Sequence, residues 1–112
     1  MNDRIELITN ELDDKKATDI QVFDMKNSDY FVDYVVVATS MGERHSLALL
    51  EYLKTALKAK GEQFLNIEAT GDWIVVDLGD TLIHLLSPDF RAKYNLEEFL
   101  QQTQKNSNKF IM

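Results

Sequence analysis

The chain has 112 residues, a length typical of one domain with a single continuous core. It contains no cysteine, which excludes disulfides, thiolate catalysis and cysteine-based zinc sites. The formal net charge is −7 and the longest basic cluster is Lys15-Lys16, so we expect no extensive direct contact with nucleic acid. The field of such a molecule favours approach to a basic protein surface instead.

No apolar run approaches the roughly 20 residues that a membrane-spanning helix requires. The N-terminal residues 1–4 lack the basic and apolar blocks of a secretory signal. We therefore expect a cytoplasmic protein with no membrane partner. The pattern predicts a single domain over residues 1–104 and a polar C-terminal tail over residues 105–112, where helical periodicity ends.

The first third of the chain predicts one helix and two strands. Apolar residues recur at helical spacing from residue 3 to about residue 13, namely Ile5, Ile8 and Leu12. Residues 19–25 alternate as a strand does, and the polar cluster 26–29 ends it. Residues 31–39 contain a continuous apolar run, which is typical of a central strand covered on both faces.

The longest predicted helix follows a break at residues 40–42 and stops at Lys60-Gly61. Its predicted buried stripe consists of leucines at helical intervals. They are Leu47, Leu50, Leu53 and Leu57, supported by Ala48, Leu49 and Ala56.

The last part of the chain predicts three strands and a helix. The strands are expected over residues 64–68, 72–78 and 81–86. Gly79-Asp80 fits a two-residue type II′ hairpin turn, and Ser87 followed by Pro88 fits the start of a helix. The buried stripe of that helix is predicted at Ala92, Leu96, Phe99 and Thr103. The element order is therefore αββαβββα, which indicates an α+β fold with a mixed five-stranded sheet and flanking helices.

A two-residue turn determines which side chains of the hairpin share a face. One face is almost wholly apolar and is predicted to point to the core: Ile74, Val76, Leu78, Thr81, Ile83 and Leu85. The other face mixes an aromatic residue, aliphatic residues and polar groups: Trp73, Val75, Asp77, Leu82, His84 and Leu86. Such a mixture is typical of a protein-binding patch. Alternatively, the last helix, with Phe90 and Tyr94, covers this face, and Trp73 and His84 are core residues.

The hairpin block resembles a known family. Residues 72–80, Asp-Trp-Ile-Val-Val-Asp-Leu-Gly-Asp, are followed by a strand with His84 and then by Arg91, Tyr94, Leu96 and Glu97. This block resembles the most distinctive segment of the ribosomal silencing factor family, also called Iojap. Residues 16–20, residues 33–39 and the pair Arg44-His45 resemble the family's first two strands and the start of its central helix. The resemblance therefore spans nearly the whole chain.

Two segments depart from the family's pattern. Residues 40–43, Ser-Met-Gly-Glu, replace a connector that is usually rich in small residues. Leu100 stands where many relatives have Trp. Neither departure falls in the block around Trp73.

The resemblance implies a nucleotidyltransferase-like fold without a catalytic role, in a bacterial cytoplasmic protein. It implies a translation repressor that binds the large ribosomal subunit through ribosomal protein L-fourteen, near the intersubunit face. There it would sterically block association with the small subunit, chiefly under nutrient limitation. The resemblance also implies that the protein can form a homodimer when it is not bound to the ribosome.

The pattern of the hairpin and the resemblance together give a set of partner-binding residues. They are Trp73, Val75, Asp77, Asp80, Leu82, His84, Arg91, Tyr94 and Glu97. Trp73 would be an aromatic anchor, and the carboxylates of Asp77 and Asp80 would meet a basic partner. Arg91, Tyr94 and Glu97 share roughly one side of the last helix and could extend the surface. Their alternative role is a solvated helix face with a local contact of Arg91 to Glu97 or Asn95.

The residues favour a binding protein over an enzyme. A nucleotidyltransferase needs clustered carboxylates to hold Mg²⁺, and the nearest pair here is Asp77 and Asp80, of which Asp80 belongs to the turn. The sequence also lacks a Gly-Ser loop that could bind a triphosphate. His45 beside Arg44 is expected to be a capping or packing residue, since it has no partnered nucleophile. We expect no metal site and no cofactor.

The competing hypothesis is a generic homodimeric scaffold that does not bind ribosomes. It would use the same sheet face or the leucine-rich helix for self-association. Mutation of Trp73 separates the two ideas, because a scaffold should lose its oligomeric state and a silencing factor should lose binding to the large subunit.

Overall fold

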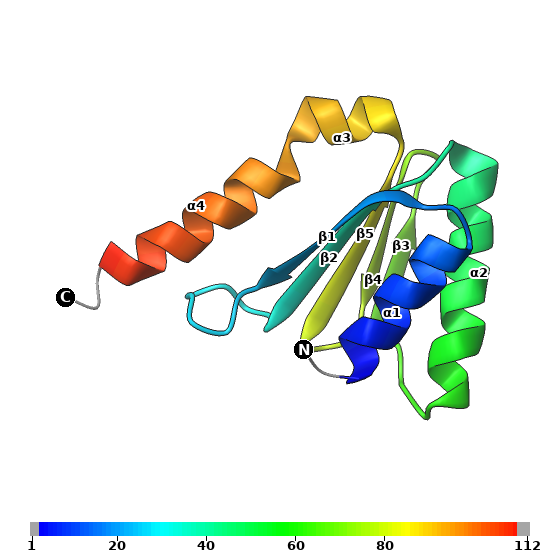
Figure 1. Ribbon diagram of the computed structural model, residues 1–112, viewed down its shortest axis with the longest axis horizontal. Helices are drawn as coiled ribbons and strands as arrows, with labels where there is room; N and C mark the ends of the chain where they lie inside the picture. The colour runs from blue at the N-terminus through cyan, green and yellow to red at the C-terminus, as the bar shows by residue number, and fades with distance from the viewer. Residues whose placement is uncertain (1–2, 110–112) are drawn as a thin grey trace.

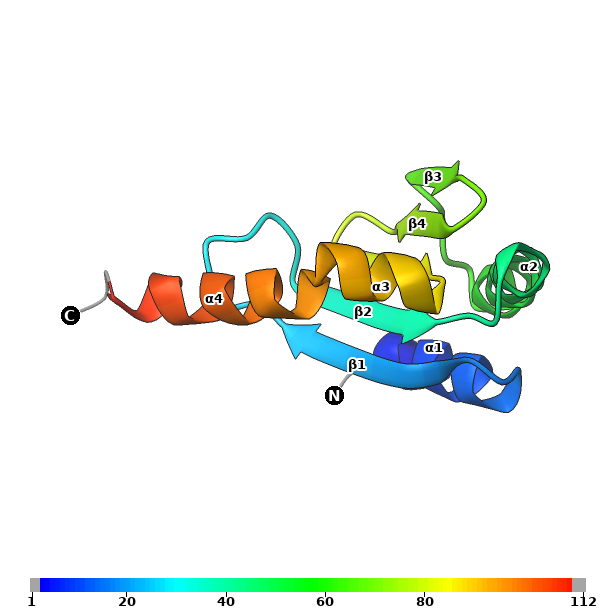
Figure 2. The same cartoon turned by 90° about the horizontal axis from the view of Figure 1, so that it is seen from above.

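The computed structural model describes residues 3–109, and the side chains of residues 3–104 (Figure 1). Within residues 3–109 the chain forms four helices and five strands. In chain order they are α1 (Asp3–Asp14), β1 (Thr18–Asp24), β2 (Tyr34–Thr39), α2 (Glu43–Ala59), β3 (Asn66–Ala69), β4 (Trp73–Asp77), β5 (Thr81–Leu86), α3 (Pro88–Tyr94) and α4 (Leu96–Lys109). The strands form one sheet, with α1 and α2 on one face and α3 and α4 on the other (Figures 1 and 2).

The strand order across the sheet is β1-β2-β5-β4-β3. β2 and β5 run parallel at the centre, and the other neighbouring pairs are antiparallel. Every residue of β5 is buried, as is every residue of β2 except the last. The prediction of a mixed five-stranded sheet with a doubly covered central strand is therefore confirmed.

β2 begins at Tyr34, so the prediction that this strand starts at Phe31 is wrong. Residues 25–33 form a closed loop, because the Met25 N–H donates to the Asp33 carbonyl at 2.7 Å. That bond ends the pairing of β1 with β2 and leaves Phe31 in the loop. Sequence alternation does not reveal where a ladder of backbone hydrogen bonds stops.

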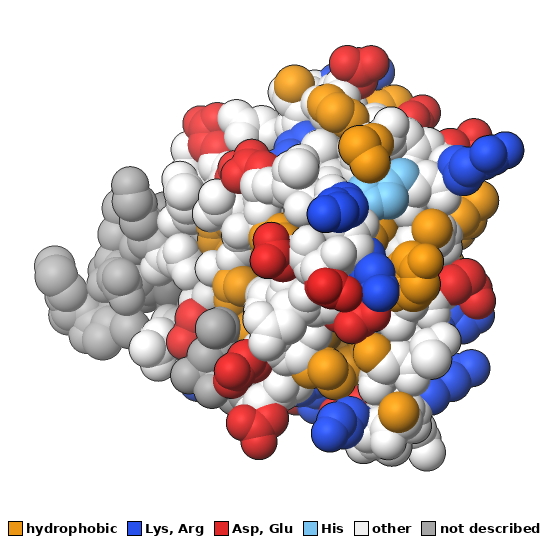
Figure 3. All heavy atoms as spheres, turned by 45° about the vertical axis from the view of Figure 1, so that its right-hand side comes forward, with side chains coloured by type: hydrophobic (Ala, Val, Ile, Leu, Met, Phe, Trp, Pro, Cys, Tyr) orange, Lys and Arg blue, Asp and Glu red, His pale blue; other side chains and the backbone are white. Residues whose placement is uncertain are grey.

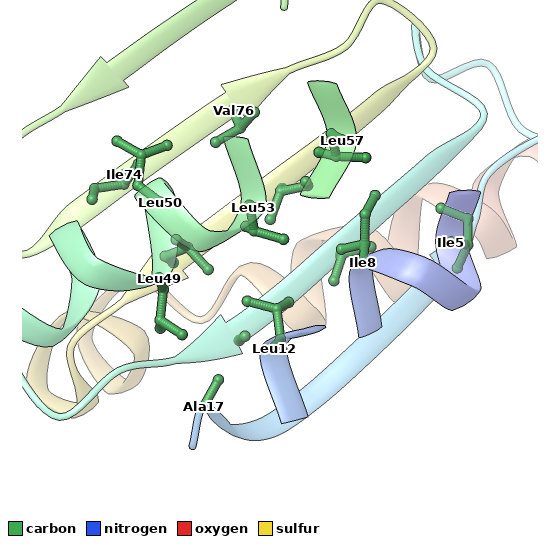
Figure 4. Close-up of a cluster of buried hydrophobic side chains, with 14 of the residues drawn as sticks. Ile5, Ile8, Leu12, Ala17, Leu49, Leu50, Leu53, Leu57, Ile74 and Val76 are labelled. Atoms are coloured by element: carbon green, nitrogen blue, oxygen red, sulfur yellow. The ribbon is translucent and has the colours of Figure 1, made fainter. Parts of the chain in front are cut away.

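The larger of two hydrophobic cores lies between the sheet and the helices α1 and α2 (Figure 4). α2 contributes four buried leucines: Leu49, Leu50, Leu53 and Leu57. Leu47 is 45% exposed, so its assignment to the buried stripe is wrong. The stripe passes through Ser46 instead, whose buried hydroxyl lies 2.5 Å from that of Ser40. The hydrogen-bonded pair of Ser40 and Ser46 thus occupies a buried position at which helical periodicity predicts an apolar residue.

The predicted last helix is in fact two helices, and the element order is αββαβββαα. α3 begins as predicted, with Ser87 as the N-cap and Pro88 in the first turn. It ends because Asn95 adopts the left-handed conformation (φ 43°, ψ 55°), which an α-helix cannot continue.

This turn overturns the predicted buried stripe of the last helix at two positions, whereas Leu96 packs against the smaller core as predicted. Ala92 and Phe99 are exposed, whereas Leu100 is 2% exposed and belongs to the smaller core, on the α3 and α4 side of the sheet. The stripe assumed one unbroken helix, and the bend at Asn95 shifts the phase of every later position (Figure 1). Leu100 therefore fills part of the smaller core.

α4 continues to Lys109, past the boundary at residue 104 where the polar tail was expected to begin. Residues 110–112 of that tail lie outside the described part of the chain. None of the helices formed by residues 3–109 is long and apolar enough to cross a membrane.

Two leucines of α2 provide a matched test of this packing. Leu53→Ala removes a side chain that is 1% exposed between α2 and the sheet, and should lower the free energy of unfolding by about 2–5 kcal/mol. Leu47→Ala makes the same chemical change at an exposed position and should cost less than about 1 kcal/mol. Urea denaturation followed by circular dichroism measures both, and equal losses would contradict the assignment of faces.

Candidate protein-binding site

The hairpin of β4 and β5 has the register that the sequence predicted. Its cross-strand pairs are Trp73–Leu86, Ile74–Leu85, Val75–His84, Val76–Ile83 and Asp77–Leu82. The turn closes as the Leu78 N–H donates to the Thr81 carbonyl at 2.9 Å, and Gly79 adopts a φ of 96°. That left-handed φ at the first turn residue is what a type II′ turn requires.

The two faces of the hairpin differ in burial. Ile74 and Val76 are fully buried on the side of α1 and α2. The residues that alternate with them along β4, namely Trp73, Val75 and Asp77, are only partly buried. We call the side formed by Trp73, Val75, Asp77, Leu82 and His84 the hairpin face.

The hairpin face is covered in part. Leu82 and His84, on the central strand β5, are 6% and 9% exposed and form its floor. The Trp73 ring contacts Tyr94 of α3, with ring centroids 5.2 Å apart, and Tyr94 is 46% exposed. The alternative of a helix covering this face therefore holds for His84, while Trp73 and Tyr94 form a partly exposed aromatic pair at its edge.

His84 holds the indole of Trp73 in place. The Trp73 Nε1–H donates to His84 Nδ1 at 3.1 Å. Because Nδ1 accepts this bond, the imidazole is neutral and carries its proton on Nε2. Burial lowers the pKa of His84 to about 4, which keeps the acceptor available at neutral pH.

Asp77 occupies the end of the hairpin face opposite Trp73. Its Oδ1 accepts a hydrogen bond from the Gly79 N–H at 2.8 Å, which fixes the carboxylate at the turn. Among the described residues, the other carboxylate oxygen, Oδ2, has no donor, and it can accept from a partner protein.

β3 widens the hairpin face with two residues that the sequence analysis missed. Asn66 pairs with Asp77 and Glu68 pairs with Val75, so both side chains point to this side of the sheet. Both are exposed. The polar-apolar-polar alternation of residues 66–68 is the signal that could have found them, but it required knowing that β3 pairs with β4.

Asp80 does not lie on the hairpin face. Its carboxylate forms an ion pair with Arg4 of α1, which also contacts Glu62 at 3.2 Å. Burial pushes the pKa of Asp80 up, but the hydrogen bond and charge of Arg4 outweigh it and leave the pKa below its usual value. Asp80 therefore ties the hairpin turn to α1, on the other face of the sheet.

Arg91 lies in a buried network rather than on an open helix face. Its Nε donates to Glu97 Oε1 at 2.7 Å, and its Nη1 donates to Thr39 Oγ1 at 2.8 Å and to the Asp19 carbonyl at 2.5 Å. The Asp19 carbonyl is available because this residue has a φ of 48° at an irregularity in β1. The predicted contact of Arg91 with Glu97 is present. The prediction that Arg91 lies on a solvated helix face is wrong, because its side chain is 7% exposed.

Arg91 thus joins four elements: α3, α4, β1 and β2. We call this junction the α3–α4 elbow. It holds α3 and places Tyr94 against Trp73. Of the nine predicted site residues, four lie at least partly exposed on the hairpin face or at its edge: Trp73, Val75, Asp77 and Tyr94.

The remaining candidates for chemistry have structural partners. His45 Nδ1 accepts from the Met41 N–H at 2.9 Å, so Nε2 carries the proton and donates to the Lys15 carbonyl at 2.9 Å. This agrees with the expected packing role. Within the described residues, no group of three or more His, Cys, Asp or Glu side chains converges as a metal site would require.

The α2 side of the molecule has a different character. In Figure 3, which brings that side forward, hydrophobic, acidic and basic side chains are interspersed. The hairpin face carries the partly exposed pair of Trp73 and Tyr94, with Lys93 Nζ 5.5 Å from the centroid of the Tyr94 ring, and the carboxylates of Asp77 and Glu68. The fold and the hairpin face together are typical of a protein-binding domain.

Comparisons with known proteins agree with the resemblance. The family described as "Ribosomal silencing factor during starvation" matches residues 1–111. The chain is 34% identical to the ribosomal silencing factor of Haemophilus influenzae, over 84% of this chain and 94% of that protein. It is 34% identical to the same factor of Zymomonas mobilis, over 83% of this chain and 71% of that protein. The chain belongs to the ribosomal silencing factor family.

Solved structures agree with the fold. A crystal structure of a Chromobacterium violaceum protein superposes with a TM-score of 0.84 and 28% identity, covering 90% of this chain and 88% of that one. A Bacillus halodurans protein gives a TM-score of 0.75 and 30% identity, covering 85% and 90% of the two chains.

The buried imidazole of His84 should make stability depend on pH. Unfolded His84 takes up a proton below its ordinary pKa of 6.5, whereas folded His84 stays neutral down to about 4, so stability is lost as pH falls. Between pH 7 and pH 5 the free energy of unfolding should fall by about 2 kcal/mol more than in His84→Gln. Urea denaturation across this range tests it, and parallel profiles of the two proteins would contradict a buried neutral His84.

The α3–α4 elbow should depend on the shape of Arg91 and not only on its charge. Arg91→Lys cannot reach Glu97, Thr39 and the Asp19 carbonyl together, and should lower the free energy of unfolding by about 2–4 kcal/mol. The reverse exchange at an exposed position of the same helix, Lys93→Arg, should change it by less than about 0.5 kcal/mol. Thermal denaturation measures both, with Trp73 fluorescence reporting any movement of α3.

Proposed function

We propose that this protein represses translation by binding the large ribosomal subunit through ribosomal protein L-fourteen. Bound there, it would sterically block association with the small subunit, chiefly under nutrient limitation. We place it in the cytoplasm, where its partner is found. The proposal gives the protein no catalytic role.

Family membership supports the ribosome as the target. The bacterial relatives are named ribosomal silencing factors, as is the matching family. A mouse relative, 31% identical over 84% of this chain and 43% of its own length, is named for mitochondrial assembly of the ribosomal large subunit. These names favour the large subunit as the docking particle.

The observation that carries the proposed docking mode is the hairpin face, with the partly exposed pair of Trp73 and Tyr94 at one end and Asp77 at the other. Aromatic side chains of this kind are frequent energetic anchors of protein interfaces. Asp77, and Glu68 on the neighbouring strand, supply carboxylates on the same side of the sheet as the anchor. Together with the net charge of −7, they favour a basic protein partner over ribosomal RNA.

The proposed steric block of subunit association requires no conformational change in the protein. The chain has a radius of gyration of 13.9 Å, so a molecule bound near the intersubunit face would occupy space that the small subunit needs. A contact anchored by Trp73 would then reduce subunit joining in proportion to occupancy of the docking site.

Co-sedimentation with isolated large subunits, small subunits and assembled ribosomes tests the proposal. The wild type should pellet with large subunits, and Trp73→Ala should bind them at least about 30-fold more weakly, as expected for loss of an anchor worth about 2 kcal/mol. Tyr52→Ala removes an aromatic side chain that is 46% exposed on α2 and should bind as the wild type does. Circular dichroism must show that all three proteins are folded.

Other outcomes point elsewhere. Binding to no particle would refute the silencing proposal. Sedimentation velocity of the same variants would then examine the scaffold hypothesis, which expects Trp73→Ala to dissociate a dimer. Retained large-subunit binding without affinity for purified L-fourteen would refute only the named partner protein.

A further inference from the structure

A second exposed aromatic cluster lies between the β1–β2 loop and α4. Phe31 and Phe99 are 70% and 53% exposed. Tyr30 lies between them, with its ring centroid 4.8 Å from Phe31 and 6.0 Å from Phe99. We call Tyr30, Phe31 and Phe99 the loop–α4 cluster.

The loop that carries Phe31 is anchored. Met25 and Val32, at its two ends, are 1% and 2% exposed in the smaller core. Between them the Ser28 hydroxyl donates to the Met25 carbonyl at 2.7 Å and accepts from the Tyr30 N–H at 3.1 Å. Phe31 is therefore presented to solvent by an organised loop, at the cost of leaving a large apolar side chain in water.

The loop–α4 cluster is separate from the hairpin face. Tyr30 packs on the same side of the sheet as Trp73. However, the loop joins the sheet at Tyr34, which pairs with Thr81, whereas Trp73 pairs with Leu86 at the other end of β5. Five residue steps along β5 correspond to about 17 Å, so the two surfaces can be occupied independently.

Carboxylates accompany the aromatic rings. Asp29 precedes Tyr30, and Glu98 precedes Phe99. Both are exposed. Glu98 accepts from two neutral amides, those of Asn95 at 2.7 Å and Gln102 at 3.4 Å, and neither of these bonds compensates its charge.

Exposed aromatic rings beside carboxylates favour a ligand that carries a guanidinium group. Aromatic faces attract cations, and a guanidinium can stack on a ring while it pairs with a carboxylate. Lys26 over the Tyr34 ring, at 5.1 Å, shows the same chemistry within the chain. A second copy is a poorer occupant, because a two-fold contact would bring together the same carboxylates from two chains of net charge −7.

We propose that the loop–α4 cluster, together with Asp29 and Glu98, is a docking site for an arginine-containing basic segment of a partner protein. Arginine stacks on Phe31 and Phe99, and neighbouring apolar side chains of the segment cover Tyr30. The proposal does not depend on what binds the hairpin face.

The test is NMR titration of the ¹⁵N-labelled full chain with a synthetic peptide of alternating arginine and leucine. We expect saturable shifts of the amides of residues 29–31 and 98–100. The double variant Phe31→Ser/Phe99→Ser should weaken binding about tenfold or more, and Asp29→Asn/Glu98→Gln should weaken it and reduce its dependence on salt. Trp73→Ala, which removes the anchor of the hairpin face, should leave it unchanged.

Several results would overturn the proposal. They include the absence of saturable shifts, shifts centred on Trp73, and equal binding of a peptide of alternating glutamate and leucine. Concentration-dependent shifts of residues 29–31 without any peptide would instead assign the cluster to self-association. Phe31 and Phe99 are exposed, so their replacement should leave the fold intact, and the amide spectrum of the variant verifies this directly.

Discussion

The parallel pairing of β2 with β5 is the constraint on which the rest of the structure depends. β5 enters the sheet between β2 and β4, and its alternate residues serve both cores: Ile83 and Leu85 face α1 and α2, and Leu82 and Leu86 face α3 and α4. A parallel pair needs a long connection, and α2 with the strands β3 and β4 provides it. The hairpin is therefore attached to the most buried strand of the molecule, which gives the hairpin face a rigid floor.

The hairpin face owes its character to incomplete coverage. α3 and α4 cover the β1, β2 and β5 part of the sheet, where Leu100 closes the smaller core. At the edge of β4, Tyr94 of α3 contacts Trp73. His84 is consequently buried enough to stay neutral, while Trp73, its hydrogen-bond partner, remains partly accessible. The hydrogen bond to the buried His84 already fixes the Trp73 side chain, and one edge of its indole is accessible to a partner. Little side-chain entropy is therefore lost when a partner binds Trp73.

The α3–α4 elbow determines how far that coverage extends. Arg91 draws α3 and α4 toward β1 and β2 with a set of charge-assisted hydrogen bonds, and the left-handed Asn95 redirects the chain along the sheet. The same geometry leaves Phe99 in solvent beside Tyr30. One buried guanidinium thus contributes to two surfaces at opposite ends of β5, one proposed for the ribosome and one for a basic segment.

Local patterns in the sequence determined most of the elements, the doubly buried central strand and the register of the hairpin, because alternation and turn type act over a few residues. They also carried the family resemblance. Only the tertiary structure decided that Asp80 pairs with Arg4, that Glu68 joins the hairpin face and that Arg91 is buried. Each of these outcomes depends on a contact between residues far apart in the chain, which no local periodicity encodes. The break at residue 95 had a local cause, but its effect on which side chains are buried was set by the sheet against which α4 packs.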